Sequence, residues 1–133
     1  MSSSKQKLSR SHMQILRMKQ IASSYFHAKK MIDCRERALS DSHSSGGESI
    51  YTRFVARVNK VFSNLDDMDR TIINNDFYYE DYQYWYTKYF SASTYYRLRN
   101  KAIKNFLSLY NRECRKAWNV HSYSYLYLYS HAH

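Results

Sequence analysis

The chain has no proline, and its two glycines, Gly46 and Gly47, stand side by side. The loops of β sandwiches and barrels need residues that adopt special backbone angles, and glycine and proline supply most of them. Long helices need neither residue in their interior. Hydrophobic residues make up 44% of the 133 positions, which is enough to build a core at this length. We therefore expect an all-α fold, organised as one compact domain with tails.

Hydrophobic spacing predicts about five helices. The first is long, basic and amphipathic, since Met18, Ile21 and Tyr25 recur at intervals of three and four residues. Such a helix suits a dimer seam or a partner helix, and a core helix of the same domain is an equally good interpretation. The expected helices cover about residues 7–39, 48–62, 65–76 and 80–89, and from the turn at 91–94 to about 118.

Composition divides the chain into four parts. Residues 40–49, SDSHSSGGES, form the expected linker between the helix of residues 1–39 and a helical domain of residues 50–118. Residues 119–133 form a tyrosine-rich tail, in which SYSYLYLYS alternates with a period of two, typical of a strand. No second strand is predicted. An irregular tail, an extension of the last helix and a pairing edge in a dimer therefore all stay open.

The break between the second and third helices is predicted at residues 63–64. A serine hydroxyl can accept a hydrogen bond from a free amide at a helix start, so we expect Ser63 to be the N-cap of the third helix. Asp66 and Asp67 then suit the positive end of the helix dipole. The hydrophobic side of this helix is expected to bury Leu65, Met68 and Ile72.

Charge is distributed unevenly along the chain. The formal net charge is +10, which points to a polyanion or an anionic membrane surface as partner. Residues 63–90 hold six acids against two bases, whereas residues 91–118 hold seven bases against Glu113 alone. We expect the basic element to face an anion and the acids of the neighbouring helices to lie on the far side.

The sequence argues against a secreted, membrane-spanning or enzymatic protein. No apolar run approaches the roughly 18 residues of a membrane span, and the polar, basic start is not a secretory signal. Cys34 and Cys114 are widely spaced, which favours reduced thiols in the cytoplasm over a disulfide. Neither a catalytic arrangement, a phosphate-cradling glycine loop nor a metal-ligand spacing is found. We expect a non-enzymatic protein with no cofactor and no metal.

The stretch most informative about function is residues 65–109, which combines two short helices, a turn rich in serine and threonine, and a longer basic helix. The major groove of DNA admits a helix, whose first turns read the base edges. Candidate base-reading residues are Ser93, Tyr96 and Arg97, of which Arg97 best suits guanine. Candidate phosphate contacts are Ser91 and Thr94 at the helix start, and Arg99, Lys101 and Lys104 along it.

The residues SASTYYRLRNKAIKNF at 91–106, preceded by LDDMDRTII at 65–73, resemble region four of bacterial sigma factors. They are closer still to the ArpU-type late transcription regulators of Firmicute phages and mollicutes. The resemblance covers residues 65–109 and implies a helix-turn-helix with Ser93–Phe106 as the recognition helix. It implies base-reading roles for Ser93, Tyr96 and Arg97. The function it implies is that of a sequence-specific, sigma-like regulator that binds double-stranded promoter DNA in the bacterial cytoplasm.

The chain departs from the family pattern at two positions of this stretch. The family also reads a base from the position of Ala92, whose side chain cannot hydrogen-bond. Tyr89 stands where sigma factors usually have a glycine in the turn, so this turn must be built differently. The sigma region that opens the promoter and binds core polymerase has no counterpart either. The resemblance therefore implies a DNA-binding regulator rather than a full sigma factor, with RNA polymerase and a second copy of the chain as further partners.

Two other classes of function stay open. A helical assembly or interaction protein, such as a phage packaging subunit, would use the same basic helices on nonspecific DNA or on a protein. A membrane-surface protein would use the amphipathic residues 5–37. The dense aromatic residues at 77–90 suit a stacking platform for single strands, but a core plus a protein interface is the more common use of such residues.

Overall fold

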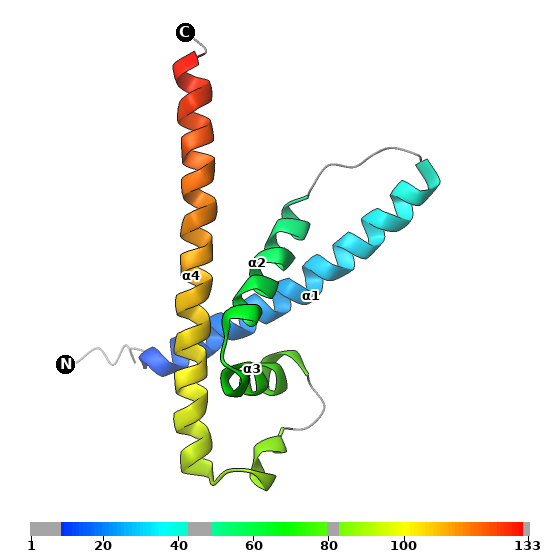
Figure 1. Cartoon of the computed structure of the whole chain (residues 1–133). Coiled ribbons are helices and arrows are strands. Elements are labelled where there is room, and N and C mark those ends of the chain that lie inside the picture. Colours follow the sequence, from blue (N-terminus) through cyan, green and yellow to red (C-terminus); the bar gives the residue numbers. More distant parts are fainter. Residues whose placement is uncertain (1–8, 43–48, 80–82, 132–133) are drawn as a thin grey trace, which may run out of the picture.

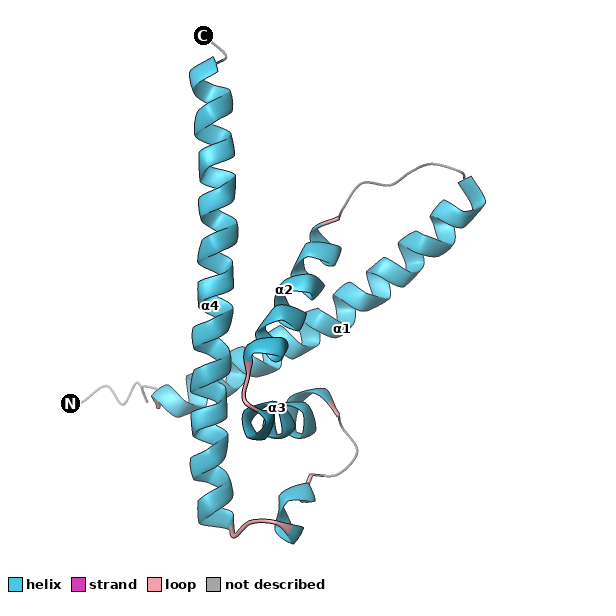
Figure 2. Ribbon diagram, viewed as in Figure 1, coloured by secondary structure: helices cyan, strands magenta, loops and turns pink. Residues whose placement is uncertain are grey.

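The computed structural model describes residues 9–42, 49–79 and 83–131, and all regular structure in these ranges is helical (Figures 1 and 2). The prediction of an all-α fold is therefore confirmed. The same ranges hold four α-helices where about five were expected, namely α1 (Arg10–Ser42), α2 (Ile50–Asn64), α3 (Asp67–Ile73) and α4 (Ala92–His131). A π-helical turn, η1 (Asn74–Tyr78), and a 3₁₀ turn, η2 (Trp85–Lys88), lie between α3 and α4.

α1 and α2 lie side by side and run in opposite directions (Figure 1). α2 begins where it does because Ser49 caps it: the Ser49 Oγ accepts a hydrogen bond from the Thr52 amide at 3.2 Å. The apolar stripe of α2 faces the core, and Val58 and Val61 are fully buried. Ile50, expected from its spacing to share this buried side, is instead 70% exposed in the first turn.

The turn between α2 and α3 differs from the prediction. α2 continues past Ser63, so the Ser63 Oγ donates to the Lys60 carbonyl within α2, at 2.8 Å, instead of capping α3. The N-cap of α3 is Asp66, directly after the extended residue Leu65. The expectation that Ser63 is the cap is therefore wrong.

The residues of α3 that face the core differ in part from the expected ones. Met68 lies in the first turn and is 45% exposed, so the prediction that it is buried is wrong. Asp69 is only 2% exposed, and its Oδ2 accepts a hydrogen bond from Asn105 Nδ2 on α4 at 2.7 Å. Ile72 is buried as expected. The side of α3 that packs on α4 is therefore partly polar.

A core in the described part of the chain joins all four α-helices. The Phe62 ring packs edge-on against the rings of Tyr78 and Phe106, at centroid distances of 4.9 and 5.4 Å. Met18 and Ile21 of α1 belong to this core. Two roles were expected for the first helix, contact with a partner helix or a dimer, and packing in the core of the same domain. Over this part of its length, α1 has the second role. The buried residues of the core are Met18, Ile21, Val58, Val61, Leu65, Ile72, Ile73, Ala102, Ile103, Phe106 and Leu107.

The fourth helix expected at residues 80–89 is absent from the described part of that range. Residues 83–89 hold only η2, and residues 80–82 lie outside the described ranges. Aromatic contacts fix this segment: Trp85 Nε1 donates to Asp76 Oδ1 at 2.7 Å, and the rings of Tyr86 and Tyr95 stack with centroids 3.7 Å apart. Among the described residues, α3 is therefore the nearest α-helix ahead of α4.

α4 is continuous over 40 residues, about 60 Å, and it extends beyond the other helices at its C-terminal end (Figure 1). The backbone of the tyrosine-rich tail belongs to α4 up to His131, so the tail extends the last helix. No glycine or proline follows Gly47 to stop it. A helix satisfies its own backbone hydrogen bonds, whereas a strand with a period of two needs a partner strand.

Candidate nucleic-acid interface

The exposed side of α4 carries a straight row of cations. Arg97, Lys101, Lys104, Arg112 and Arg115 are spaced so that their directions fall within about 80° of the helix surface. All five are exposed, and none has an ion-pair partner among the described residues. We call these five residues the cationic stripe. It is about 27 Å long at about 1.5 Å per residue.

The opposite side of α4 determines where the stripe points. Tyr95, Ala102 and Phe106 are buried against the other helices. The hydrogen bond from Asn105 to Asp69 ties α4 to α3 on one flank of this buried side. Rotation of α4 would expose Phe106 and bury a cation at once, and both changes cost free energy. The stripe is thus held toward solvent.

Other cations of α4 have partners within the chain. Lys116 and Lys60 both contact the Glu113 carboxylate, at 3.3 and 3.4 Å. Burial acts to raise the pKa of Glu113, but the hydrogen bonds and charges of Lys116 and Lys60 outweigh it and lower that pKa. Arg99 is half-buried, with its guanidinium carbon 5.0 Å from the centroid of the Tyr96 ring. These residues do not belong to the stripe.

The start of α4 is capped by its own neighbours. The Thr94 amide donates to Ser91 Oγ at 3.4 Å, and Ser91 Oγ donates to Thr94 Oγ1 at 3.0 Å. The two hydroxyl groups predicted to bind phosphate are thus bonded to each other. Ser93 is exposed, one turn before Arg97 on the same side of the helix.

The structure separates the predicted contact residues into two groups. Ser93 and Arg97 lie in line with the stripe, and so do the predicted phosphate contacts Lys101 and Lys104. Tyr96 and Arg99 lie on the flank that faces η2. There Tyr96 is 47% exposed, and both side chains line a separate hollow.

Arg112 and Arg115 are missing from the sequence-based candidates, although they complete the stripe. The recognition helix was predicted to end at Phe106, so the basic residues beyond it were not connected to it. Their distances of 15 and 18 residues from Arg97 place them close to its direction on a continuous helix. This spacing is the signal that would have identified them.

Two residues outside α4 border the stripe. Arg10, at the start of α1, lines an open groove of about 410 Å³ together with Lys104 and Ser108. Asp66 lines a shallow hollow with Ser108 on the other flank. The expectation that the neighbouring acids lie on the far side is therefore wrong for Asp66, and also for the buried Asp69, which lines the same hollow. Both positions follow from the packing of α3 against the middle of α4.

Among the residues that the structure describes, no helix combines the length and the apolar character needed to cross a membrane. Nor do three histidine, cysteine or acidic side chains of these residues gather as a metal ion would require. Cys34 and Cys114 are both free thiols.

No family model matches the chain, and no curated protein or solved structure is detectably similar to it.

Proposed function

We propose that this protein is a double-stranded DNA-binding transcriptional regulator that places the first turns of α4 in the major groove. The observation that carries the proposal is the cationic stripe, whose five exposed cations have no ion-pair partner in the described part of the chain. Cations aligned in this way repel one another. The phosphate backbone of DNA supplies the opposite charge along a comparable length.

A straight helix reaches base edges over only part of its length, because the groove curves away around the duplex. α4 begins at Ala92, so Ser93 and Arg97 lie in its first two turns, where DNA-binding helices contact bases. Arg97 has the paired donors that suit O6 and N7 of guanine. Tyr96, on the flank, reaches toward an adjacent base. Lys101 and Lys104 would then contact the phosphates that border the groove.

The regulatory role rests on the resemblance of residues 65–109 to sigma region four and to ArpU-type regulators. It is supported by the position of Ser93 and Arg97 at the start of α4, where those families read their promoters. We extend the proposal to promoters of a phage or another mobile element. RNA polymerase and a second copy of the chain are the further partners that it includes.

Selection of duplexes from a random pool tests the proposal, followed by fluorescence anisotropy on the winner and on a scrambled duplex. A sequence-reading regulator should bind the winner at least about 10³-fold more tightly. Arg97→Ala should weaken binding to the winner by about 1–3 kcal/mol and relax the base preference. Lys104→Ala should weaken all duplexes alike. If Arg97→Ala changed neither affinity nor preference, its base-reading role would be wrong.

A second candidate function is a helical assembly protein that binds DNA without reading it. The length of the stripe favours this candidate, since Lys104, Arg112 and Arg115 lie beyond the turns that reach bases. Equal and steeply salt-dependent binding to the winner and the scramble would support it. Binding to neither duplex at low salt would assign the stripe to a protein partner.

A further inference from the structure

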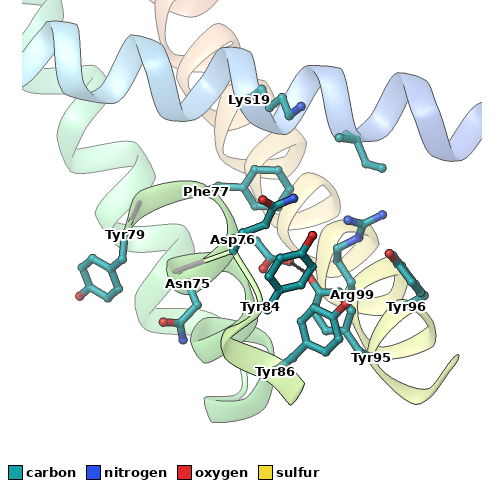
Figure 3. Close-up of a pocket in the computed structure, with 12 residues that line it drawn as sticks. Lys19, Asn75, Asp76, Phe77, Tyr79, Tyr84, Tyr86, Tyr95, Tyr96 and Arg99 are labelled. Atoms are coloured by element: carbon teal, nitrogen blue, oxygen red, sulfur yellow. Dashed lines mark hydrogen bonds between the residues drawn. The ribbon is translucent and has the colours of Figure 1, made fainter. Parts of the chain in front are cut away.

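A polar hollow lies on the flank of α4 that faces η2, below α1 (Figure 3). Its volume is about 370 Å³, within the range of about 300–1,000 Å³ that is usual for small-ligand pockets. Lys19 of α1 lines it from one side. Tyr84 and Tyr86 line it from the segment of η2, and Tyr96 and Arg99 line it from α4.

The groups that line the hollow leave positive charge unbalanced. Its one acid among the described residues, Asp76, accepts hydrogen bonds from Trp85 Nε1 and from the Tyr95 hydroxyl. Neither Lys19 nor Arg99 has an ion-pair partner in the described ranges. The Nε of Arg99 is buried there without a hydrogen-bond partner. Because the donors from Trp85 and Tyr95 are neutral, Asp76 keeps its charge, and the two cations and one carboxylate leave one positive charge that an anion would compensate.

The two cations approach the same space from different walls. Figure 3 shows the Arg99 guanidinium directed toward α1, where Lys19 lies, and the hydroxyl groups of Tyr84 and Tyr96 pointing the same way. Burial and the hydrogen bond to Asp76 raise the pKa of Tyr95, so this phenol stays neutral. Its hydroxyl already donates to Asp76, so a bound anion would take its hydrogen bonds from Lys19 and Arg99 first.

Aromatic rings surround the same space. The rings of Tyr86 and Tyr95 are stacked with an interplanar angle of 2°, which makes this wall flat. Tyr84 and Tyr96 are 53% and 47% exposed, so their rings are accessible to a ligand. Exposed tyrosine rings stack with planar bases. Cations and rings together suit a ligand that has both an anionic group and a planar ring.

We propose that this hollow binds a nucleoside monophosphate, with the phosphate between Lys19 and Arg99 and the base against the tyrosine rings. The same chemistry could be supplied by a free nucleotide or by one nucleotide of bound DNA. We assign the site to the free nucleotide, because the hollow opens on the flank of α4 and not along the stripe. Tyr96 is shared with the proposed base-reading turns of α4, whereas Lys19 and Arg99 belong to the hollow and not to the stripe.

Trp85 reports on the site, because it donates to Asp76 at the wall of the hollow. Trp118 is the other tryptophan, so the full chain carrying Trp118→Phe leaves Trp85 as the single reporter. Its fluorescence is followed during titration with AMP, GMP, CMP and UMP, with the matching nucleosides, and with inorganic phosphate. We expect at least one monophosphate to bind about tenfold more tightly than its nucleoside and than phosphate. Failure of all four monophosphates would overturn the proposal.

Variants that remove a positive charge test whether the change in Trp85 fluorescence arises from binding in the hollow. Lys19→Gln and Arg99→Gln should each weaken monophosphate binding by about tenfold. The matched control Lys101→Gln, on the stripe of the same helix as Arg99, should leave it unchanged while it weakens duplex binding. Unaltered monophosphate binding in both hollow variants would overturn the site. Circular dichroism verifies folding, and the exposed Lys19 provides the decisive variant if Arg99→Gln unfolds.

The same measurements separate this site from the proposed function. Duplex binding without monophosphate binding would overturn the nucleotide site alone, and monophosphate binding without duplex binding would overturn the DNA-binding proposal alone. Duplex binding that Arg99→Gln abolishes, with no binding of free monophosphates, would assign the hollow to a nucleotide of DNA and overturn our assignment.

Discussion

Replacement of Arg112 and Arg115 by glutamine tests whether the cationic stripe binds DNA along its whole length. Each phosphate contact contributes about −0.9 to the slope of log K against log salt concentration. If both arginines contact phosphates, the double variant should have a slope that is less steep by about 1.8. Over a fourfold rise in salt, from about 50 to about 200 mM, the unchanged protein should lose about 12-fold more affinity than the variant.

Anisotropy of one labelled duplex across a salt series measures both slopes. The matched control is the double variant Lys30→Gln with Lys88→Gln, which removes the same charge from exposed positions off the stripe. Its slope should remain close to that of the unchanged protein. Equal slopes for the Arg112/Arg115 variant and the unchanged protein would show that the contact with DNA ends before Arg112. An equal loss in the control would show that net charge, and not the stripe, governs binding.

Three further substitutions test the interface and the packing behind it. Asp66→Asn removes an acid at the edge of the stripe and should strengthen binding to every duplex by about 0.5 kcal/mol in the same assay. Asn105→Ala removes the amide that donates a hydrogen bond to the buried Asp69, and it should lower the free energy of unfolding in urea by about 2 kcal/mol. The control is Ser108→Ala at an exposed position of the same helix, and a loss in Asn105→Ala no larger than in this control would contradict the prediction. Tyr78→Phe removes a buried hydroxyl without a hydrogen-bond partner in the described ranges and should raise that free energy by about 1 kcal/mol. Burial raises the pKa of Tyr78, so stability should fall as pH rises above about 10, and thermal melts should show a smaller fall in the variant.

The class of the fold was predicted correctly, and the periodicity of α4 agrees with its buried side. Ala102 and Phe106 are spaced by four residues and both are buried, and Tyr95 lies on the same side. These positions report the period of a helix directly, because only one side of α4 meets the other helices. The orientation of the stripe follows from the same pattern, since it is the opposite side.

The buried side of α3 could not be predicted in the same way. Ile72 and Ile73 are both buried, and Asp69 lies between their directions on the helix. Met68 lies about 90° from the midpoint of these two directions. Burial of Asp69 depends on Asn105, which lies 36 residues later, and no local pattern reports such a pair. Cap residues are ambiguous for a similar reason, because both Ser63 and Asp66 are suitable by type.

The candidate interface was predicted in part. Arg97, Lys101 and Lys104 were identified from the basic character of residues 91–106, and the same criterion included Arg99. Arg99 differs from the others because the tyrosine rings of α4 and η2 surround it. The surroundings of Arg99 depend on the path of residues 83–91. The sequence predicts the end of an α-helix followed by a turn for this segment, whereas the structure has a 3₁₀ turn there.

The continuity of α4 has a consequence for the way this protein can change during evolution. An insertion or deletion of one residue between Phe106 and Arg112 would turn everything beyond it by about 100° and shift it by about 1.5 Å along the axis. Arg112 and Arg115 would then leave the line of Arg97 even though every side chain remained. Substitutions at exposed positions of this stretch, such as Ser108, are therefore tolerable, whereas Leu107 is held by the core. Changes in the length of the stretch should be confined to about seven residues at a time, which restore nearly the same direction.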